Sequence, residues 1–118
     1  MKKSDPLWKV CDALCRKIVR LRDGGKCRVC GQPQTDTIHI IDRDVSITRC
    51  DPANCYAGCR KHHNHGKPLD LIAQHISVVG KEEVFRLCVL SQQLVTYRRA
   101  DLVLIREELK RRLNEIQS

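Results

Sequence analysis

The chain is organised around Cys27-Arg28-Val29-Cys30-Gly31, a C-x-x-C pair followed by a glycine. Two thiolates at this spacing bind one ion because a tight turn directs both sulfurs inward, and Gly31 relieves the backbone where the turn closes. Further along the chain, Cys59 and His62 share one face of the first turn of an expected helix. Together the two pairs predict a closed tetrahedral site of three sulfurs and one nitrogen, and this ligand set favours zinc.

Three other side chains are alternative ligands for the same ion. Cys55 lies four positions before Cys59, His63 lies four positions after it, and Cys50 is close by. We expect Cys50 and Cys55 to pack in the core instead. The expected ligands are Cys27, Cys30, Cys59 and His62.

The composition of the 118-residue chain narrows the class of protein to which it can belong. It contains 8 cysteines, and cysteines at short spacing beside histidines indicate metal ligands rather than disulfides in a reducing cytosol. The formal charge of +8 indicates an anionic partner, of which nucleic acid is the commonest. Because only 4 residues are aromatic, base stacking is disfavoured and contacts with phosphate are expected.

The sequence contains no membrane or export signal. No run approaches the roughly 20 apolar residues of a membrane span. The first 15 residues are interrupted by Asp5, Lys9 and Asp12, which excludes a signal peptide. We therefore expect a cytoplasmic protein with no membrane partner.

An N-terminal helix and a β-hairpin are expected in the first half of the chain. Residues 1–25 predict an amphipathic helix, which the Ser4-Asp5-Pro6 signal opens, and in which Cys11 and Cys15 are small core residues. Residues 26–50 are rich in β-formers, with Val45 and Ile47 among them, and predict a hairpin whose turn is Asp42-Arg43-Asp44.

Residues 68–118 predict a helical tail. One helix runs from Pro68 to Gly80, and a second runs from Lys81 to Gln93. In the second helix we expect an inward face of Val84, Phe85 and Cys88, with Leu87 as a further candidate. The last helix opens at Asp101, and its apolar stripe is either a core face, which is the default, or a dimer seam. The stripe comprises Leu102, Ile105, Leu109, Leu113 and Ile116.

Positive charge is concentrated in the same half as the candidate ligands. Residues 1–67 hold 14 Lys+Arg and 7 Asp+Glu, whereas residues 68–118 hold 8 and 7. The polar face of the first helix is either a phosphate-facing stripe or an ordinary solvated face. It carries Lys9, Arg16, Lys17 and Arg20.

A longer ordered pattern links the two ligand pairs. C-x-x-C-G is followed by Ile38-His39-Ile40-Ile41-Asp42-Arg43, by Thr48-Arg49-Cys50-Asp51-Pro52-Ala53-Asn54-Cys55, and by Cys59-x-x-His62-His63-Asn64-x-Gly66. These motifs resemble the NinG, or Rap, recombination proteins of lambdoid phages, a family that looks like a branch of the zinc-containing HNH, or His-Me finger, nucleases. The similarity covers most of residues 14–115 and continues through Gly80-Lys81-Glu82-Glu83, Arg99-Ala100-Asp101-Leu102 and Glu108-Leu109-Lys110.

The resemblance implies an α+β fold with a treble-clef (ββα-metal) core in residues 26–67. In this arrangement zinc is structural and the chemistry occurs beside it. His39 would be the general base, and Asn54 would either position that histidine or brace the loop. His63 would bind a catalytic Mg²⁺ or Mn²⁺ ion.

The sequence also departs from the family pattern. Many HNH enzymes have a metal-binding aspartate directly before the base histidine, and here that position is Ile38. Asp36 or Asp42, each three positions from His39, would have to supply the oxygen. The family tends to have cysteine at the position of His62 and asparagine at that of His63, so Asn64 is an alternative metal ligand.

The resemblance implies an endonuclease of phage recombination, encoded by a phage or prophage and acting on branched DNA such as Holliday junctions or D-loops. The helical tail, residues 68–118, would then be a possible dimerisation surface, because a two-fold junction is best cut by a two-fold protein. A catalytically silent DNA-binding module and a protein–protein adaptor are the alternatives. The cations expected to hold phosphates are Arg28, Arg43, Arg49, Arg60, Lys61 and Lys67.

Overall fold

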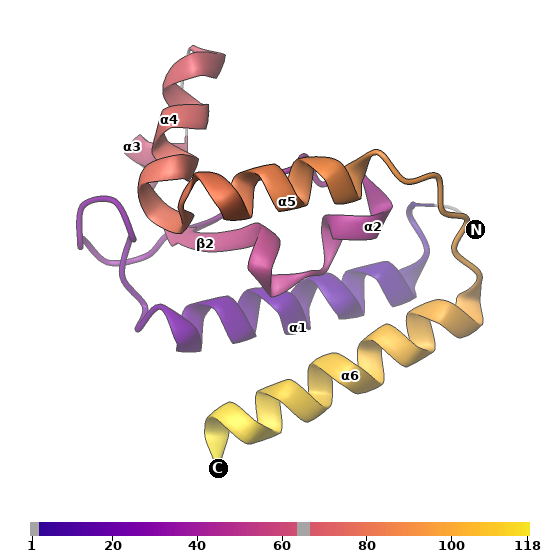
Figure 1. The fold of residues 1–118 in the computed structure, drawn as a ribbon. Coiled ribbons are helices and arrows are strands. Elements are labelled where there is room, and N and C mark those ends of the chain that lie inside the picture. The colour runs from indigo at the N-terminus through magenta and orange to yellow at the C-terminus, as the bar shows by residue number, and fades with distance from the viewer. Residues whose placement is uncertain (1–2, 64–66) are drawn as a thin grey trace.

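The computed structural model describes residues 3–63 and 67–118, in which helices surround a small two-stranded sheet (Figure 1). Helices α1 and α6 lie side by side, β2 and α2 lie on the other side of α1, and α5 covers α2. In chain order the elements are α1 (Pro6–Arg22), β1 (Asp36–His39), α2 (Ser46–Arg49), the 3₁₀ turn η1 (Pro52–Asn54), β2 (Cys55–Gly58), α3 (Arg60–His63), α4 (Pro68–Val79), α5 (Lys81–Ser91) and α6 (Arg99–Gln117).

Helix α1 forms where the sequence predicts it. The carboxylate of Asp5 accepts a hydrogen bond from the N–H of Leu7 at 2.8 Å, and Pro6 occupies the first turn. The helix ends before Gly24 and Gly25, which both adopt a φ of 69°, a left-handed conformation that favours glycine.

The main hydrophobic core lies between α1 and α6. Helix α1 contributes buried side chains that include Trp8, Cys11 and Cys15, which confirms the expected packing of the two cysteines. Leu102, Leu109 and Leu113 of α6 are buried against this face. The apolar stripe of the last helix is therefore a core face from Leu102 to Leu113, which was the default prediction, whereas Ile116 is exposed.

The sheet differs from the predicted hairpin. Strand β1 pairs antiparallel with β2, in a register that places Ile38 opposite Tyr56 and His39 opposite Cys55. The predicted turn does form, because the Asp42 carboxylate accepts a hydrogen bond from the N–H of Asp44 at 2.8 Å. It leads into helix α2, however, and not into a second strand.

The hairpin prediction is wrong because tertiary contacts override β-propensity in residues 45–49. Thr48 and Arg49 are both buried in α2, and the buried Asn54 binds the carbonyl oxygen of Thr48. A β-branched residue favours a strand only where a neighbouring strand receives its side chain. Here the strand that pairs with β1 comes after η1.

The helices of the tail follow their predicted boundaries closely. Helix α4 ends at Gly80, whose φ is 91°, and α5 begins directly after it. The predicted inward face of α5 is right for Leu87, which is fully buried, and wrong for Phe85 and Cys88, which are exposed. Helix α5 packs on α4 and α2, so only the side of the helix that carries Leu87 is covered.

The helix expected to carry Cys59 and His62 on its first turn is present as α3. Helix α3 covers Arg60–His63, and the N–H groups of His62 and His63 both donate to the carbonyl oxygen of Cys59. The alternative metal ligand Asn64 lies outside the described residues. Cys59 therefore stands at the start of the helix, directly after β2.

Candidate functional site

A tight turn after α1 presents the first ligand pair. The N–H of Gly31 donates to the carbonyl oxygen of Cys27 at 2.8 Å, and the N–H of Cys27 donates to that of Gln32 at 2.7 Å. Gly31 has a φ of 77°, so this position requires the glycine that the sequence provides. The turn is closed and directs Cys27 and Cys30 to the same side.

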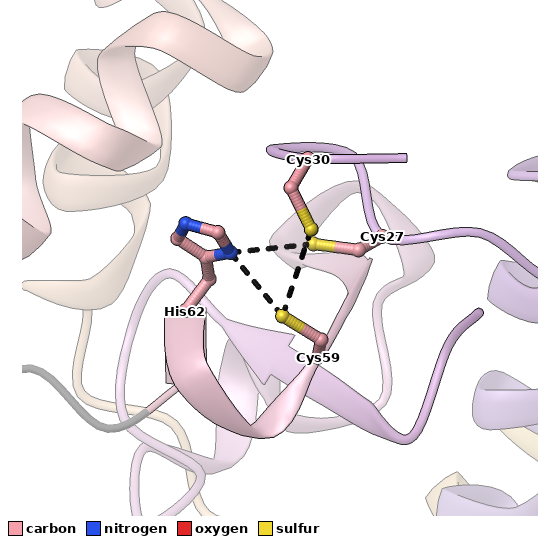
Figure 2. Close-up of side chains that lie close together, drawn as sticks. All are labelled: Cys27, Cys30, Cys59 and His62. Atoms are coloured by element: carbon pink, nitrogen blue, oxygen red, sulfur yellow. Dashed lines mark hydrogen bonds between the residues drawn. The ribbon is translucent and has the colours of Figure 1, made fainter. Parts of the chain in front are cut away.

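The four predicted ligands come together in one cluster, with their donor atoms all within 4.8 Å of one another. Figure 2 shows the Cys27, Cys30 and Cys59 sulfurs and the His62 ring pointing inward. The Cys30 and Cys59 sulfurs are 3.8 Å apart, and Nδ1 of His62 is 3.2 Å from the Cys59 sulfur. Tetrahedral Zn–S bonds of about 2.3 Å separate two sulfurs by about 3.8 Å. The cluster therefore has the donor atoms and spacing to hold a zinc ion.

The electrostatics of the turn favour a thiolate at Cys27. Burial opposes ionisation of Cys27, but main-chain N–H groups of Cys30 and Val29 outweigh this effect, and the pKa of the Cys27 thiol is lowered. A thiolate is the form that binds metal.

The alternative cysteine ligands lie elsewhere. Cys55 is buried beside Cys15, and the hydrogen bond with that thiol, together with burial, raises the pKa of Cys55. The Cys50 thiol donates to the Asp12 carboxylate at 3.3 Å, and burial raises its pKa. Both thiols therefore remain protonated in the core, as the sequence indicated.

A buried hydrogen-bond network attaches the metal cluster to α4. The side-chain amide of Gln74 donates to the carbonyl oxygen of His62 and to the hydroxyl of Tyr56, both at 2.9 Å. The Tyr56 hydroxyl lies 2.7 Å from Nδ1 of His75. This network fixes the end of α3 that carries the histidine ligand.

A cleft of about 430 Å³ opens beside the metal cluster. His39 lines it, from the end of β1, and so do His63 and Asp42. His63 comes from α3 and directly follows the zinc ligand His62. The fold therefore brings the two histidines with predicted catalytic roles to one cavity, next to the cluster but outside it.

The local contacts of His39 fix its tautomer. Its Nε2 lies 3.3 Å from the carbonyl oxygen of Arg49, and because a carbonyl only accepts, Nε2 carries the proton. The lone pair is then on Nδ1. Burial lowers the pKa of His39, so the neutral ring is favoured at neutral pH. A neutral imidazole with one unprotonated nitrogen is the form of a general base.

His63 is oriented by a carboxylate. Its Nδ1 lies 2.7 Å from Oδ2 of Asp36, which leaves Nε2 as the nitrogen that can accept or bind a cation. The hydrogen bond with His63 lowers the pKa of Asp36, and Arg60 lies 3.2 Å from the same oxygen. Of the two proposed carboxylates, Asp36 contacts His63, whereas Asp42 lines the cleft.

Asn54 is buried and braces the loop after β1. Its side chain accepts from the N–H of Ile41 at 2.8 Å and donates to the carbonyl oxygen of Ile41 at 3.0 Å and to that of Thr48 at 3.2 Å. Of the two roles considered for Asn54, these contacts are those of a brace. It holds the loop between His39 and Arg49 and donates to neither residue.

Ile38 occupies the position at which many HNH enzymes have aspartate. Its side chain is 1% exposed and packs against Gly58 of β2 so closely that a Cβ there would lie 2.2 Å from its Cδ1. This position is filled by core packing. A metal-binding oxygen must therefore come from another residue.

The predicted phosphate-binding cations differ in their availability. Arg60, Lys61 and Lys67 are exposed, and so are Arg28 and Arg43. The prediction is wrong for Arg49, whose side chain is only 5% exposed, pairs with Asp12 at 2.8 Å and lies over the ring of Trp8. The positive charge of Arg49 is paired with Asp12 in the interior and is not exposed to solvent.

Asp12 is a residue of this site that sequence reasoning missed. It is buried in α1 and accepts from Arg49, Arg43 and the Cys50 thiol. A signal was available, because Asp12 is the one carboxylate within Pro6–Arg22 and adjoins the core residue Cys11. An acidic residue beside the apolar face of a basic helix indicates a buried partner.

Every helix within residues 3–63 and 67–118 is too short or too polar to traverse a bilayer. Comparison with family models, with curated proteins and with solved structures gave no match for this chain.

Proposed function

We propose that this protein is a zinc-stabilised DNA endonuclease of the HNH, or His-Me finger, kind. The observation that carries the proposal is the shared cleft of His39 and His63, each with its tautomer fixed by a neighbour, directly beside a Cys₃His cluster. The turn, the antiparallel strand pair and the following short helix support a treble-clef core in which zinc has a structural role.

In this proposal His39 is the general base. Its Nδ1 takes a proton from a water molecule, and the resulting hydroxide attacks the phosphorus atom of a phosphodiester while the opposite P–O bond breaks and the departing oxygen takes a proton from solvent water. The carbonyl of Arg49 keeps the imidazole in the required tautomer and stabilises the imidazolium that forms. Asn54 holds the intervening loop in place.

In this proposal a divalent cation would be held beside His63. His63 and Asp42 both line the cleft, and Mg²⁺ commonly takes few protein ligands and keeps water and phosphate oxygens for the rest. Asp36 would orient His63 by accepting from its Nδ1. When bound, Mg²⁺ or Mn²⁺ supplies positive charge that stabilises the crowded oxygens of the phosphoryl group.

The resemblance to NinG proteins supplies the more specific part of the proposal. It indicates branched DNA, such as Holliday junctions or D-loops, as substrate and recombination of a phage or prophage in the bacterial cytoplasm as the setting. Paired incision of a two-fold junction would need a homodimer. Light scattering with and without junction DNA tests this assembly, and a strict monomer in both conditions would exclude paired incision.

The decisive experiment combines metal analysis with cleavage of linear, flap and four-way DNA. We expect about one zinc per chain and a Mg²⁺- or Mn²⁺-dependent product from the branched substrates. His39→Ala should abolish this product, and the variant's own zinc content and DNA affinity serve as controls for its folding. His63→Ala should retain zinc and lose the response to added divalent cation.

The alternative is a zinc-stabilised DNA-binding module without activity, and the packing of Ile38 favours it, because no carboxylate stands directly before His39. A wild-type protein that binds DNA tightly but cuts none of these substrates with either cation would support this alternative and refute the nuclease proposal.

A further inference from the structure

The cations of the first half of the chain fall into two groups that only the structure separates. Arginines 22, 28, 43, 49 and 60 each lie within 4.0 Å of a carboxylate, provided by Asp12, Asp23 or Asp36. Their charges are partly or wholly neutralised within the protein. In contrast, no ion pair among the described residues includes Arg16, Lys17 or Arg20.

These three side chains lie together on α1 and line a second cleft, of about 400 Å³. The other side of this cleft is formed by the segment that leads into β1, and within the described residues no carboxylate lines it. All three cations are exposed. The lining residues are Arg16, Lys17, Arg20, Gln34, Thr35 and Thr37.

The second cleft adjoins the cavity of His39. Arg16 and Thr37 line both. Arg16 and Arg20 are one helical turn apart, so they rise about 6 Å along α1 and continue the line of the cleft away from His39. One wall of the second cleft carries hydroxyl and amide groups, and the other carries guanidinium and ammonium groups. Proteins use these groups to hold phosphate oxygens.

We infer that this face of α1, formed by Arg16, Lys17 and Arg20, holds the phosphodiester backbone of the DNA strand where that strand leaves the His39 cleft. The inference takes its ligand class, DNA, from the proposed function. Charge complementarity identifies the occupant, because a cleft with three unpaired cations and no lining carboxylate attracts a polyanion. The sequence allowed this helix face to be either a phosphate-facing stripe or an ordinary solvated face. The inference selects the phosphate-facing stripe.

The test is DNA binding without added divalent cation, so that cleavage plays no part in it. A short fluorescein-labelled duplex is titrated with the wild type and with the triple variant Arg16→Ala/Lys17→Ala/Arg20→Ala between about 50 and 200 mM salt. Each lost phosphate contact lowers the salt slope of log K by about 0.9, so we expect a reduction of about 2 to 3 for the triple variant.

The matched control is Lys110→Ala/Arg111→Ala/Arg112→Ala on α6, which removes the same formal charge from residues that line neither cleft. We expect this control to change the slope by less than about 1. Equal losses in the two variants would show that only net charge matters and would overturn the inference. Unchanged binding by the α1 variant would also overturn it.

A second measurement uses the unaltered protein and is independent of variant folding. DNA should protect Lys17 from acetylation by a soluble reagent while leaving Lys110 reactive, as detected by mass spectrometry. Equal labelling of Lys17 with and without DNA would refute the contact. Protection of Lys17 by anionic phospholipid vesicles and not by DNA would assign the face to a membrane surface instead. A protein that binds in this way but cuts nothing would refute only the nuclease proposal.

Discussion

The Nε2 atom of His39 lies 3.3 Å from the main-chain carbonyl oxygen of Arg49. The guanidinium of the same arginine is fixed in turn by Asp12 of α1, to which its Nε and Nη2 donate at 3.1 and 2.8 Å. An ion pair between α1 and α2 therefore holds the residue whose carbonyl binds the imidazole. The N-terminal helix is part of the support of the candidate site.

The first prediction concerns the protonation of His39. Because burial lowers its pKa, we expect titration followed by NMR to give a midpoint below the ordinary value of 6.5, with Nε2 as the protonated nitrogen of the neutral ring. Any nuclease activity should then persist as the pH falls to 6.5 and decline only below it, when Nδ1 becomes protonated. A midpoint above 6.5, or a proton on Nδ1 of the neutral ring, would contradict this assignment.

The second prediction concerns the Asp12–Arg49 pair. Asp12→Ala leaves a buried guanidinium without its carboxylate and should lower the free energy of unfolding by about 3–5 kcal/mol, measured by urea denaturation with zinc bound. Asp44→Ala, at an exposed aspartate, is the control and should change stability by less than about 0.5 kcal/mol.

The same pair allows a rescue experiment. Asp12→Leu combined with Arg49→Met replaces both charges by apolar side chains of similar volume and should recover most of the lost stability. If Asp12→Ala were as mild as the Asp44 control, the pair would not hold α2 against α1.

The sequence predicted those features that depend on spacing within a short segment. The four clustered ligands follow from C-x-x-C-G and from Cys59 and His62 one helical turn apart. The start of α1 follows from Asp5 and Pro6, and the core face of α6 follows from its apolar periodicity. Each of these signals is local, and no distant segment competes with it.

The predictions that were wrong depend on which distant segments of the chain contact each other. Val45 and Ile47 have the composition of a strand, but β1 finds its partner in β2. The sequence does not distinguish Arg49 from Arg60, because both lie in a basic segment. In the structure Arg49 is buried against Asp12, whereas Arg60 is exposed. Strand pairing and the pairing of charges are tertiary properties, so a pattern of residue types alone does not determine them.

The third prediction concerns the support of the metal cluster by α4. Gln74→Leu removes the donor to the carbonyl oxygen of His62 and should weaken zinc binding by about tenfold, measured by competition with a chromogenic chelator. Gln93→Leu, at an exposed glutamine outside this network, is the control. Equal zinc affinities in the two variants would show that α4 does not support the cluster.

The last prediction tests the contact between Ile38 and Gly58. Gly58 has no positive φ, so alanine is compatible with its backbone, but the new Cβ would lie 2.2 Å from Cδ1 and 2.7 Å from Cγ1 of Ile38. Gly58→Ala should therefore destabilise the protein by about 1–3 kcal/mol through overpacking.

A double-mutant cycle separates this clash from other effects of the substitution. Ile38→Ala removes Cγ1 and Cδ1 and costs about 2–4 kcal/mol in the wild type because it leaves a cavity. In the Gly58→Ala protein the added methyl group occupies part of that space, so the two losses should sum to more than the loss in the double variant by about 1–2 kcal/mol. Additive losses in urea denaturation would mean that the strands separate to relieve the contact.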